Sequence, residues 1–439
     1  MPKLRDAFTI LILFSAFPVL SGQVPGTIPP AGPPLTLEQA TAMAIKAHPQ
    51  VGVAQNMAAA AGQHITEARS AYYPAIDGEI TASQGLYQSR LGAGSITTSL
   101  LFNRIGSGLQ MTQLLTDFGR TKNLVAQSRY QSEAAAQATQ ATIYDVVLGV
   151  NRAYYGVLEA QAYVDVANQT VRARDALANQ VTTLANAQLK SQVDVSFAQV
   201  NLSEARLLLI RSQDAVERAY ADLARAMGQD RTVRYPLAAA GFPPALSSSP
   251  DTLIADAIQN RPELRNLRLQ LQAAKSFEQA EADLKRPDVS FIGVGGVLPY
   301  LDQNPHVAPH EYEALAVNVD VPIFNGHLFT ARHEAARYEA QASDQRLRNL
   351  QQQIERDVRT TWITASTAYQ RIPVTAELLK QAQLALDLAQ GRYDLGLASI
   401  VEITQAQLNL TQAQIENVTA KYDYQSAYAE LQYAIGALR

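Results

Sequence analysis

Two kinds of residue pattern share the chain, and the longer kind lacks helix-breaking residues. No proline occurs between Pro74 and Pro236, and none follows Pro373. Between Arg120 and Met227, where the only glycines are Gly149 and Gly156, and again after Pro373, the chain is rich in Ala, Gln, Leu, Glu and Arg, which favour the α-helix. Because each stretch is far longer than an ordinary globular helix, the pattern predicts long helices that pack as a coiled coil or bundle.

The shorter kind alternates apolar and polar residues, as a strand with one apolar face does. Ile76 and Ile80 alternate with Asp77 and Glu79, and the segment 314–323 repeats the pattern in the second half of the chain. Loops rich in Gly, Ser, Asn and Pro separate the strands of each pair. The predicted strands lie at about 75–87, 105–116, 288–298 and 312–323.

The chain repeats itself, which indicates one structural unit used twice. Pro49 matches Pro262 at an offset of 213, and Gly228 matches Gly436 at an offset of 208. The change of offset falls between residues 74 and 117, where a loop absorbs it. We therefore expect a first repeat, a linker and a second repeat at 35–230, 231–250 and 251–439.

Two isolated strand pairs do not make a sandwich core, because a lone hairpin is marginally stable in water. Strands of about ten residues with one apolar face are typical of outer-membrane barrels. A sheet in lipid must close, and four strands are fewer than the roughly eight of the smallest such barrels. The pattern therefore favours several copies that share one barrel. Strands of a soluble domain packed on the helices are the alternative.

The N-terminus and the composition narrow the function classes. Lys3 and Arg5 precede the short apolar run 7–20, which indicates a signal peptide over 1–22, with a retained anchor as the alternative. The Pro-rich segment 23–34 is expected to be an extended linker. With 36 basic and 40 acidic residues the net charge is −4, which argues against nucleic-acid binding. The absence of Cys excludes disulfides and thiolate metal sites.

Several ordered segments carry a family resemblance, and the strongest runs from Arg392 to Glu402. The segments are LTLEQA at 35–40, DFGR at 117–120, PIFNG at 322–326, RYDLGLASIVE at 392–402 and AQLNL at 406–410. In these segments the chain resembles the TolC-like outer-membrane efflux protein family. The resemblance extends over about residues 35 to 438.

The resemblance implies a mainly α membrane protein of mixed α/β class. A long coiled-coil helical barrel would join a transmembrane β-barrel that trimerisation completes, with four strands per chain and an internal two-fold repeat. It implies a homotrimeric exit duct in outer-membrane lipid, with a periplasmic helical domain, that works with a periplasmic adaptor protein and an inner-membrane pump. It implies no enzyme activity and no cofactor. A soluble periplasmic coiled-coil adaptor or scaffold is the competing hypothesis.

Four residues are candidates for a channel constriction: Glu402, Gln405, Asp194 and Tyr393. The resemblance places Glu402, Gln405 and, in the first repeat, Asp194 where the family closes its tunnel with acidic side chains. From the residues alone, Ser191 and Ser399 precede Asp194 and Glu402 by three positions, a spacing that also predicts helix capping. Both hypotheses stay open for these carboxylates.

Tyr393 and the inter-helix turns are the other candidates. The resemblance places Tyr393 where a tyrosine links neighbouring helices in the closed state, although Ala398 stands where the family often has a basic partner; simple helix packing is the alternative. The turns correspond to adaptor-docking tips, or are plain turns: the residues concerned are Gln188, Leu189, Gly396 and Leu397. Asp117 and Asn325 are expected to cap the helices that follow them.

Residues for catalysis or metal binding are few. His306 and His310 share a loop with acidic residues, but Pro305 and Pro309 prevent the regular helix that would align the two imidazoles. We therefore expect a solvated loop and no metal site. No Ser/His/Asp set or phosphate-binding loop stands out.

Overall fold

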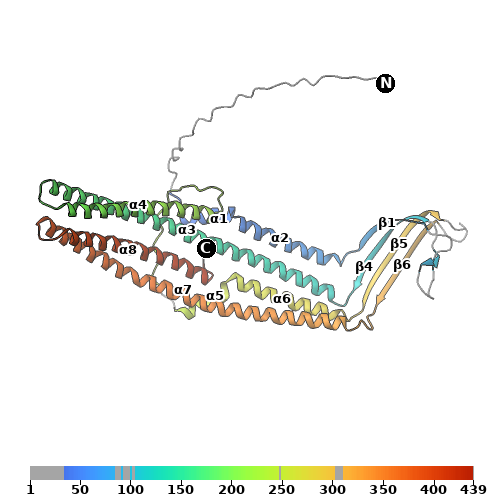
Figure 1. The fold of residues 1–439 in the computed structure, drawn as a ribbon. Coiled ribbons are helices and arrows are strands. Elements are labelled where there is room, and N and C mark those ends of the chain that lie inside the picture. The colour runs from blue at the N-terminus through green and yellow to red at the C-terminus, as the bar shows by residue number, and fades with distance from the viewer. Residues whose placement is uncertain are drawn as a thin grey trace, which may run out of the picture.

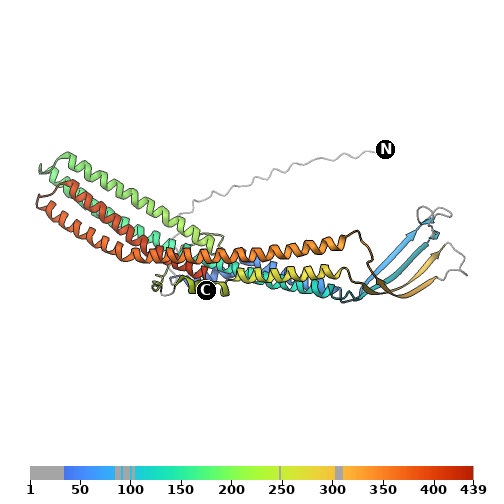
Figure 2. The same cartoon turned by 90° about the horizontal axis from the view of Figure 1, so that it is seen from below.

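The chain forms an elongated helical body with a β-sheet at one end and two helical hairpin tips at the other (Figures 1 and 2). The structure is a computed structural model. It describes residues 34–84, 90–91, 99–100, 104–246, 249–301 and 310–438. The expected signal peptide, and all of the expected linker before residue 34, lie outside these residues. Among the described residues, no helix is both long and apolar enough to cross a membrane.

Two helices run the whole length of the body. α3 (Arg120–Asn186) and α7 (Leu328–Asp394) have 67 residues each, about 100 Å at 1.5 Å per residue. The long helices predicted from the sequence are therefore present. α3 tolerates its two glycines, and α7 continues through Pro373.

Shorter helices lie end to end beside the two long ones. α2 (Pro49–Ser70) and α4 (Gln192–Ala226) pack on α3, while α6 (Pro262–Asp283) and α8 (Ile400–Ala434) pack on α7 and also contact α3. Two further helices, α1 (Leu37–Ala47) and α5 (Pro250–Asn260), pack on α3 and α7 at mid-length. The body is thus several helices wide along its whole length (Figure 1).

The waist is the level at which α4 and α8 end against the junctions α1–α2 and α5–α6. Gly228 has φ +70°, and a Cβ there would lie 2.6 Å from the Cα of His48. Gly436 has φ +71°, and its Cβ would lie 3.1 Å from the backbone nitrogen of Arg261. The same close approach therefore explains why glycine occurs at this position in both repeats.

The core is concentrated near the waist and is fixed by buried tyrosines. Tyr154 is fully buried, and its hydroxyl donates to the carbonyl oxygens of Leu35 and Ala238 at 2.8 and 2.6 Å. The Tyr424 hydroxyl donates to the carbonyl of Pro244. Because Ala238 and Pro244 belong to the connection between the repeats, these bonds hold that connection on the helices.

The sheet brings strands of both repeats together. Its order is β1 (Ala75–Ser83), β4 (Arg104–Thr116), β5 (Asp288–Leu301) and β6 (Glu311–Asp320), all antiparallel. β2 (Arg90–Leu91) and β3 (Ser99–Leu100) form a separate ribbon. β1 and β6 are the edges of the four-stranded sheet, and each edge strand has one paired side among the described residues.

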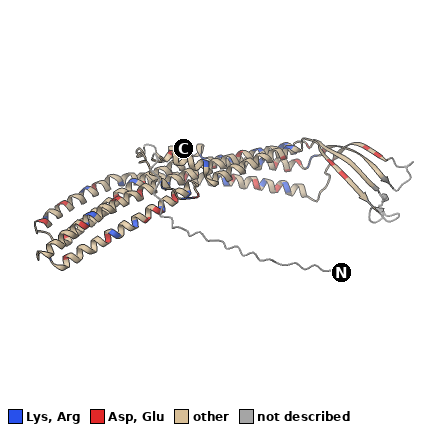
Figure 3. Cartoon of the chain, turned by 90° about the horizontal axis from the view of Figure 1, so that it is seen from above, with Lys and Arg blue, Asp and Glu red and all other residues tan. Residues whose placement is uncertain are grey.

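One face of this sheet is apolar and largely exposed among the described residues. Ile80 is 83% exposed, Leu109 62%, Leu315 78% and Val317 62%. Charged residues of both signs lie along the helices, and those on the four-stranded sheet are mainly acidic (Figure 3). The alternation predicted from the sequence therefore corresponds to a real apolar face, which the chain does not cover with its own helices.

The expected helix caps at Asp117 and Asn325 are wrong in position. The N-cap residues of α3 and α7 are Gly119 and His327, which both have positive φ. Asp117 still serves the start of α3, because its Oδ2 accepts from the Thr121 backbone nitrogen at 2.6 Å. The strand-to-helix turn places two more residues between the carboxylate and the helix than a simple cap requires.

Candidate functional site

The two hairpin tips share one backbone turn. At the first tip, between α3 and α4, the backbone nitrogen of Leu189 donates to the carbonyl of Leu184 at 2.8 Å. At the second tip, between α7 and α8, Leu397 donates to Arg392 at 2.8 Å. These bonds, with a positive-φ residue between helix and turn, define the Schellman ending of a helix.

The positive-φ residue differs between the tips. Gly396 adopts φ +75° at the second tip, and Gln188 adopts φ +62° at the first. Gln188 takes this conformation although it has a Cβ, which is uncommon for a residue other than Gly, Asn or Asp. Leu189 and Leu397 are 70% and 67% exposed, so each tip presents a leucine to solvent.

An apolar cluster joins the two hairpins just behind the tips. We call it the tip cluster; it draws on α3, α4, α7 and α8 and contains Leu177, Ala178, Val181, Ala198, Leu202, Tyr393, Ile400 and Ile403. Ala398 packs against it. A polar link accompanies it, because Gln180 of α3 donates to the Asp394 carboxylate at 3.1 Å.

Tyr393 is the aromatic centre of the tip cluster. It is only 3% exposed, and its hydroxyl is buried without a hydrogen bond in the described part of the chain. The ammonium nitrogen of Lys190 lies 4.5 Å from the ring centre, as in a cation–π contact. Burial raises the pKa of Tyr393, and the charges of Asp194 and Asp394 raise it further.

Asp194 is fully engaged at the start of α4. Its backbone nitrogen donates to Ser191 Oγ at 3.1 Å, and its Oδ2 accepts from the Ser191 backbone nitrogen at 3.0 Å. This reciprocal pair is a capping box. The capping hypothesis therefore describes the Asp194 side chain in this structure.

Glu402 makes only half of the corresponding box. Its backbone nitrogen donates to Ser399 Oγ at 3.3 Å, but its carboxylate turns to Arg392, whose Nε lies 3.1 Å from Oε1. Gln405, one turn further on, donates to Asn409 at 2.9 Å. Glu402 and Gln405 thus lie on the exposed side of α8, apart from the tip cluster.

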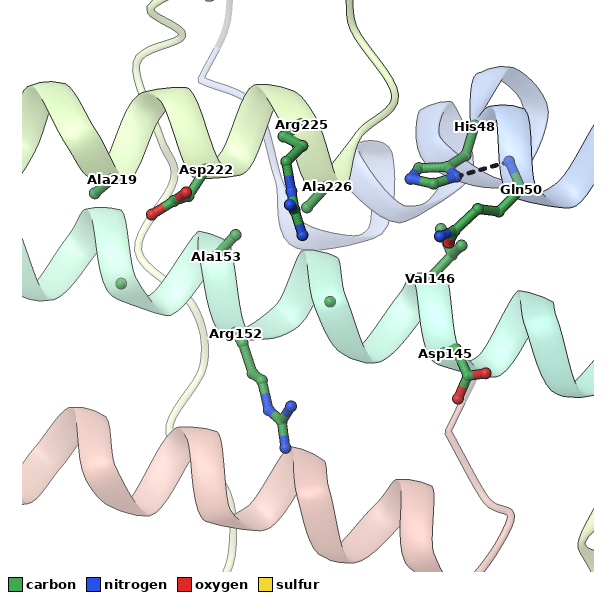
Figure 4. Close-up of a pocket in the computed structure, with 12 residues that line it drawn as sticks. His48, Gln50, Asp145, Val146, Arg152, Ala153, Ala219, Asp222, Arg225 and Ala226 are labelled. Atoms are coloured by element: carbon green, nitrogen blue, oxygen red, sulfur yellow. Dashed lines mark hydrogen bonds between the residues drawn. The ribbon is translucent and has the colours of Figure 1, made fainter.

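A cavity of about 700 Å³ lies at the waist, far from the tips. Small residues of α3 and α4 form part of its wall, and Asp145, Arg152 and Asp222 bring charges to it (Figure 4). His48 Nδ1 accepts from the backbone nitrogen of Gln50 at 3.2 Å at one end. No residue that the sequence singled out as a gate or a docking tip lines this cavity.

The sequence proposed candidates for a gate but did not single out Lys190, Arg392 or Gln180, which contact three of those candidates or their neighbours. Lys190 stands at the position of the first repeat that corresponds to Ala398, which was the only signal that could have found it. The possible metal-site residue His306 lies outside the described residues, and His310 Nδ1 lies 2.9 Å from the Leu298 carbonyl oxygen. In the described part of the chain, no group of three His, Asp or Glu residues is placed to hold a metal ion.

Comparison with known proteins decides the family. The model of the outer membrane efflux protein family matches residues 41–229 and 253–437, once in each half of the chain. The chain belongs to the outer membrane efflux protein family. This membership favours a channel over a soluble adaptor, and efflux-family members are channels rather than enzymes.

Individual members of the efflux family share the fold at low identity. The outer membrane protein TolC of Salmonella enteritidis is 23% identical over 400 residues, which cover 86% of this chain and 77% of that protein. The outer membrane protein VceC of Vibrio cholerae superposes with a TM-score of 0.78 at 18% identity, covering 91% and 96%. The open state of the MtrE outer membrane channel of Neisseria gonorrhoeae gives 0.75 at 17% identity, covering 92% and 89%.

Proposed function

We propose that three copies of this chain form an outer-membrane exit duct of a tripartite efflux or type I secretion system. Cargo would pass from a pump and the periplasm to the exterior by passive conduction through the bore. The sheet would lie in the outer membrane, and the helical body would extend into the periplasm.

The apolar, uncovered face of the four-stranded sheet carries this proposal. Its two edge strands, β1 and β6, have no second neighbour in the described chain. A lipid environment leaves no sheet edge unpaired, because an unsatisfied backbone group costs several kcal/mol there. Pairing β6 of one copy with β1 of the next would close a ring and turn the apolar face to lipid.

The hairpin tips are suited to partner contact. Each tip ends on an exposed leucine beside a turn whose backbone is already hydrogen-bonded. We assign Gln188, Leu189, Gly396 and Leu397 to the docking of a periplasmic adaptor protein, which in turn holds an inner-membrane pump. Preformed turns bind with a small loss of conformational entropy.

Among the gate candidates, Glu402 is the carboxylate available to line the bore. Asp194 uses Oδ2 for the cap of α4, whereas the Glu402 side chain is 43% exposed and, among the described residues, pairs with Arg392. Three copies of Glu402 around an axis would attract cations, as acidic rings do in channels. Gln405 adds no charge to this ring, and Tyr393 holds the two hairpins together behind it.

Planar-bilayer recordings test the proposed duct and the role of Glu402. The wild-type protein should form cation-preferring channels. Glu402→Ala should weaken cation preference and block by divalent cations, whereas Arg392→Ala should strengthen both, because it removes the charge that neutralises Glu402. Unchanged selectivity in both variants would remove Glu402 from the bore, and a wild-type protein without channels would overturn the duct.

Cell fractionation tests location separately. A duct stays with the outer membrane after a high-salt wash, because its apolar strands lie in lipid. A soluble scaffold is released by the same wash, and its appearance in the soluble fraction would contradict the proposal.

A further inference from the structure

Four residues form a row across the sheet, midway along β1 and in the halves of β4, β5 and β6 that lie farther from the helices. Glu79 of β1 is opposite Gly108 of β4, Gly108 is opposite Gly296 of β5, and Gly296 is opposite Tyr312 of β6. Residues directly opposite on paired strands lie on the same face of a sheet. The row therefore runs straight across all four strands on one face.

This face is the polar one. Successive residues of a strand point to opposite faces. Leu109 and Leu315, which carry the apolar face, are separated from Gly108 and Tyr312 by an odd number of positions. If the apolar face meets lipid, as the proposed function requires, the row lines the outer half of the bore. The inference below rests on that function.

The end of the Tyr312 ring fills the space above both glycines. A Cβ at Gly108 would lie 2.3 Å from Tyr312 Oη and 3.2 Å from its Cζ. A Cβ at Gly296 would lie 2.6 Å from each of the same two atoms, and it would also meet the backbone oxygen of Ser107 on β4. Because real Cβ contacts are not this short, the ring occupies a position that only glycine on both strands permits.

The two glycines thus let a large side chain lie along the wall. Tyr312 starts on the edge strand β6 and reaches across β5 to β4, and it is 41% exposed. An aromatic ring laid over sheet glycines covers backbone that has no side chain of its own. Its other face remains open to the bore. Any side chain at position 108 would displace the ring from the wall.

We propose that Tyr312, held flat by Gly108 and Gly296, sets the width of the outer half of the bore. Three copies place three rings at one level of the channel, so a small movement of each ring acts on the same cross-section. The two glycines keep the bore wide at the level of this row, and Tyr312 limits the size of cargo that passes this level.

Polymer exclusion from the outer side of a planar bilayer measures this width without involving the periplasmic end. Polyethylene glycols of graded size are added to that side, and the largest polymer that still changes the conductance is recorded. Gly108→Ala should shift the cutoff to smaller polymers, because the new methyl group meets the movable end of Tyr312. Tyr312→Ala should shift it to larger ones.

Gly78→Ala is the matched control. It adds the same methyl group to a neighbouring strand, where the nearest atom, Leu109 Cδ2, would lie 3.7 Å away in ordinary contact. Its cutoff should equal that of the wild type. The double variant Gly108→Ala with Tyr312→Ala should have the large cutoff of Tyr312→Ala, since no ring remains to be displaced.

The outcomes separate this inference from the duct itself. A wild-type protein that forms no channel contradicts the proposed function. Wild-type channels with the same cutoff in Tyr312→Ala overturn the role of Tyr312, whatever the folding of Gly108→Ala. A larger cutoff in Tyr312→Ala together with an unchanged cutoff in assembled Gly108→Ala channels would show that Gly108 does not control the position of the Tyr312 ring.

Discussion

The two hairpin tips have the same backbone turn and different side chains around it. At the first tip, Ser191 and Asp194 form both hydrogen bonds of a capping box. At the second tip, the Glu402 backbone nitrogen donates to Ser399 Oγ, but the Glu402 carboxylate does not return the second bond. Glu402 instead pairs with Arg392 across the turn, at 3.1 Å. Tyr393 is buried at the second tip, where the first repeat has Ala185.

The two repeats therefore use the same backbone turn but make different side-chain contacts around it. The hydrogen-bonded turn is kept in both copies because the backbone needs it. The first tip uses its acidic side chain to cap α4, whereas the second pairs its acidic side chain with Arg392 and buries an aromatic ring. Lys190 of the first tip lies over the Tyr393 ring of the second tip, so this contact connects the two tips.

The largest effect is expected from removing the Tyr393 ring, which has no counterpart at the first tip. Tyr393→Ala should destabilise the tip region by about 3–5 kcal/mol, as for other buried aromatic residues. Tyr393→Phe should change little, because the buried hydroxyl makes no hydrogen bond in the described part of the chain. Hydrogen exchange at the amides of Leu189 and Leu397 reports both tips. Equal protection in Tyr393→Ala and wild type would show that the ring does not hold the hairpins together.

The sequence predicted most of this fold, because periodicity and repetition are local signals. The strand pattern at Ile76 and Ile80, the long helices and the matching glycines Gly228 and Gly436 all describe features present in the structure. The helix starts were misplaced because the turn at Phe118 and Gly119 has positive φ, which spacing from Asp117 does not reveal.

The site was predicted less completely, because its contacts cross between helices. The spacing from serine predicted capping at both Asp194 and Glu402, and the structure has the reciprocal box at Asp194 alone of the two. The shorter Asp side chain reaches back to the cap, while the longer Glu reaches Arg392. The contact of Lys190 with Tyr393 joins residues about 200 positions apart, so it needs the tertiary fold.

A smaller effect is expected from the caps. Ser191→Ala removes a reciprocal cap and should cost about 1 kcal/mol at the start of α4. Ser399→Ala removes a single bond of 3.3 Å and should cost less at the start of α8. Hydrogen exchange at the first turns of both helices makes the comparison. A larger loss for Ser399→Ala would reverse our division of roles between the tips.

The smallest expected effect is a dependence on alkaline pH. The pKa of Tyr393 is raised from 10.0 by burial, so the unfolded tip releases its phenol proton before the folded one does. Stability is therefore intact below about pH 10 and falls as the pH rises through the folded pKa. Tyr393→Phe should lose part of this alkaline decline, measured by exchange at Leu397. An identical pH profile in the variant would mean that Tyr393 does not contribute to it.

The central claim is that the four strands of one chain are completed by other copies in lipid. The mass of the detergent-solubilised complex, determined by light scattering with the detergent contribution subtracted, tests it most directly. We predict a complex of three chains that aggregates when detergent is removed. A single chain that stays soluble and monodisperse without detergent would contradict the account.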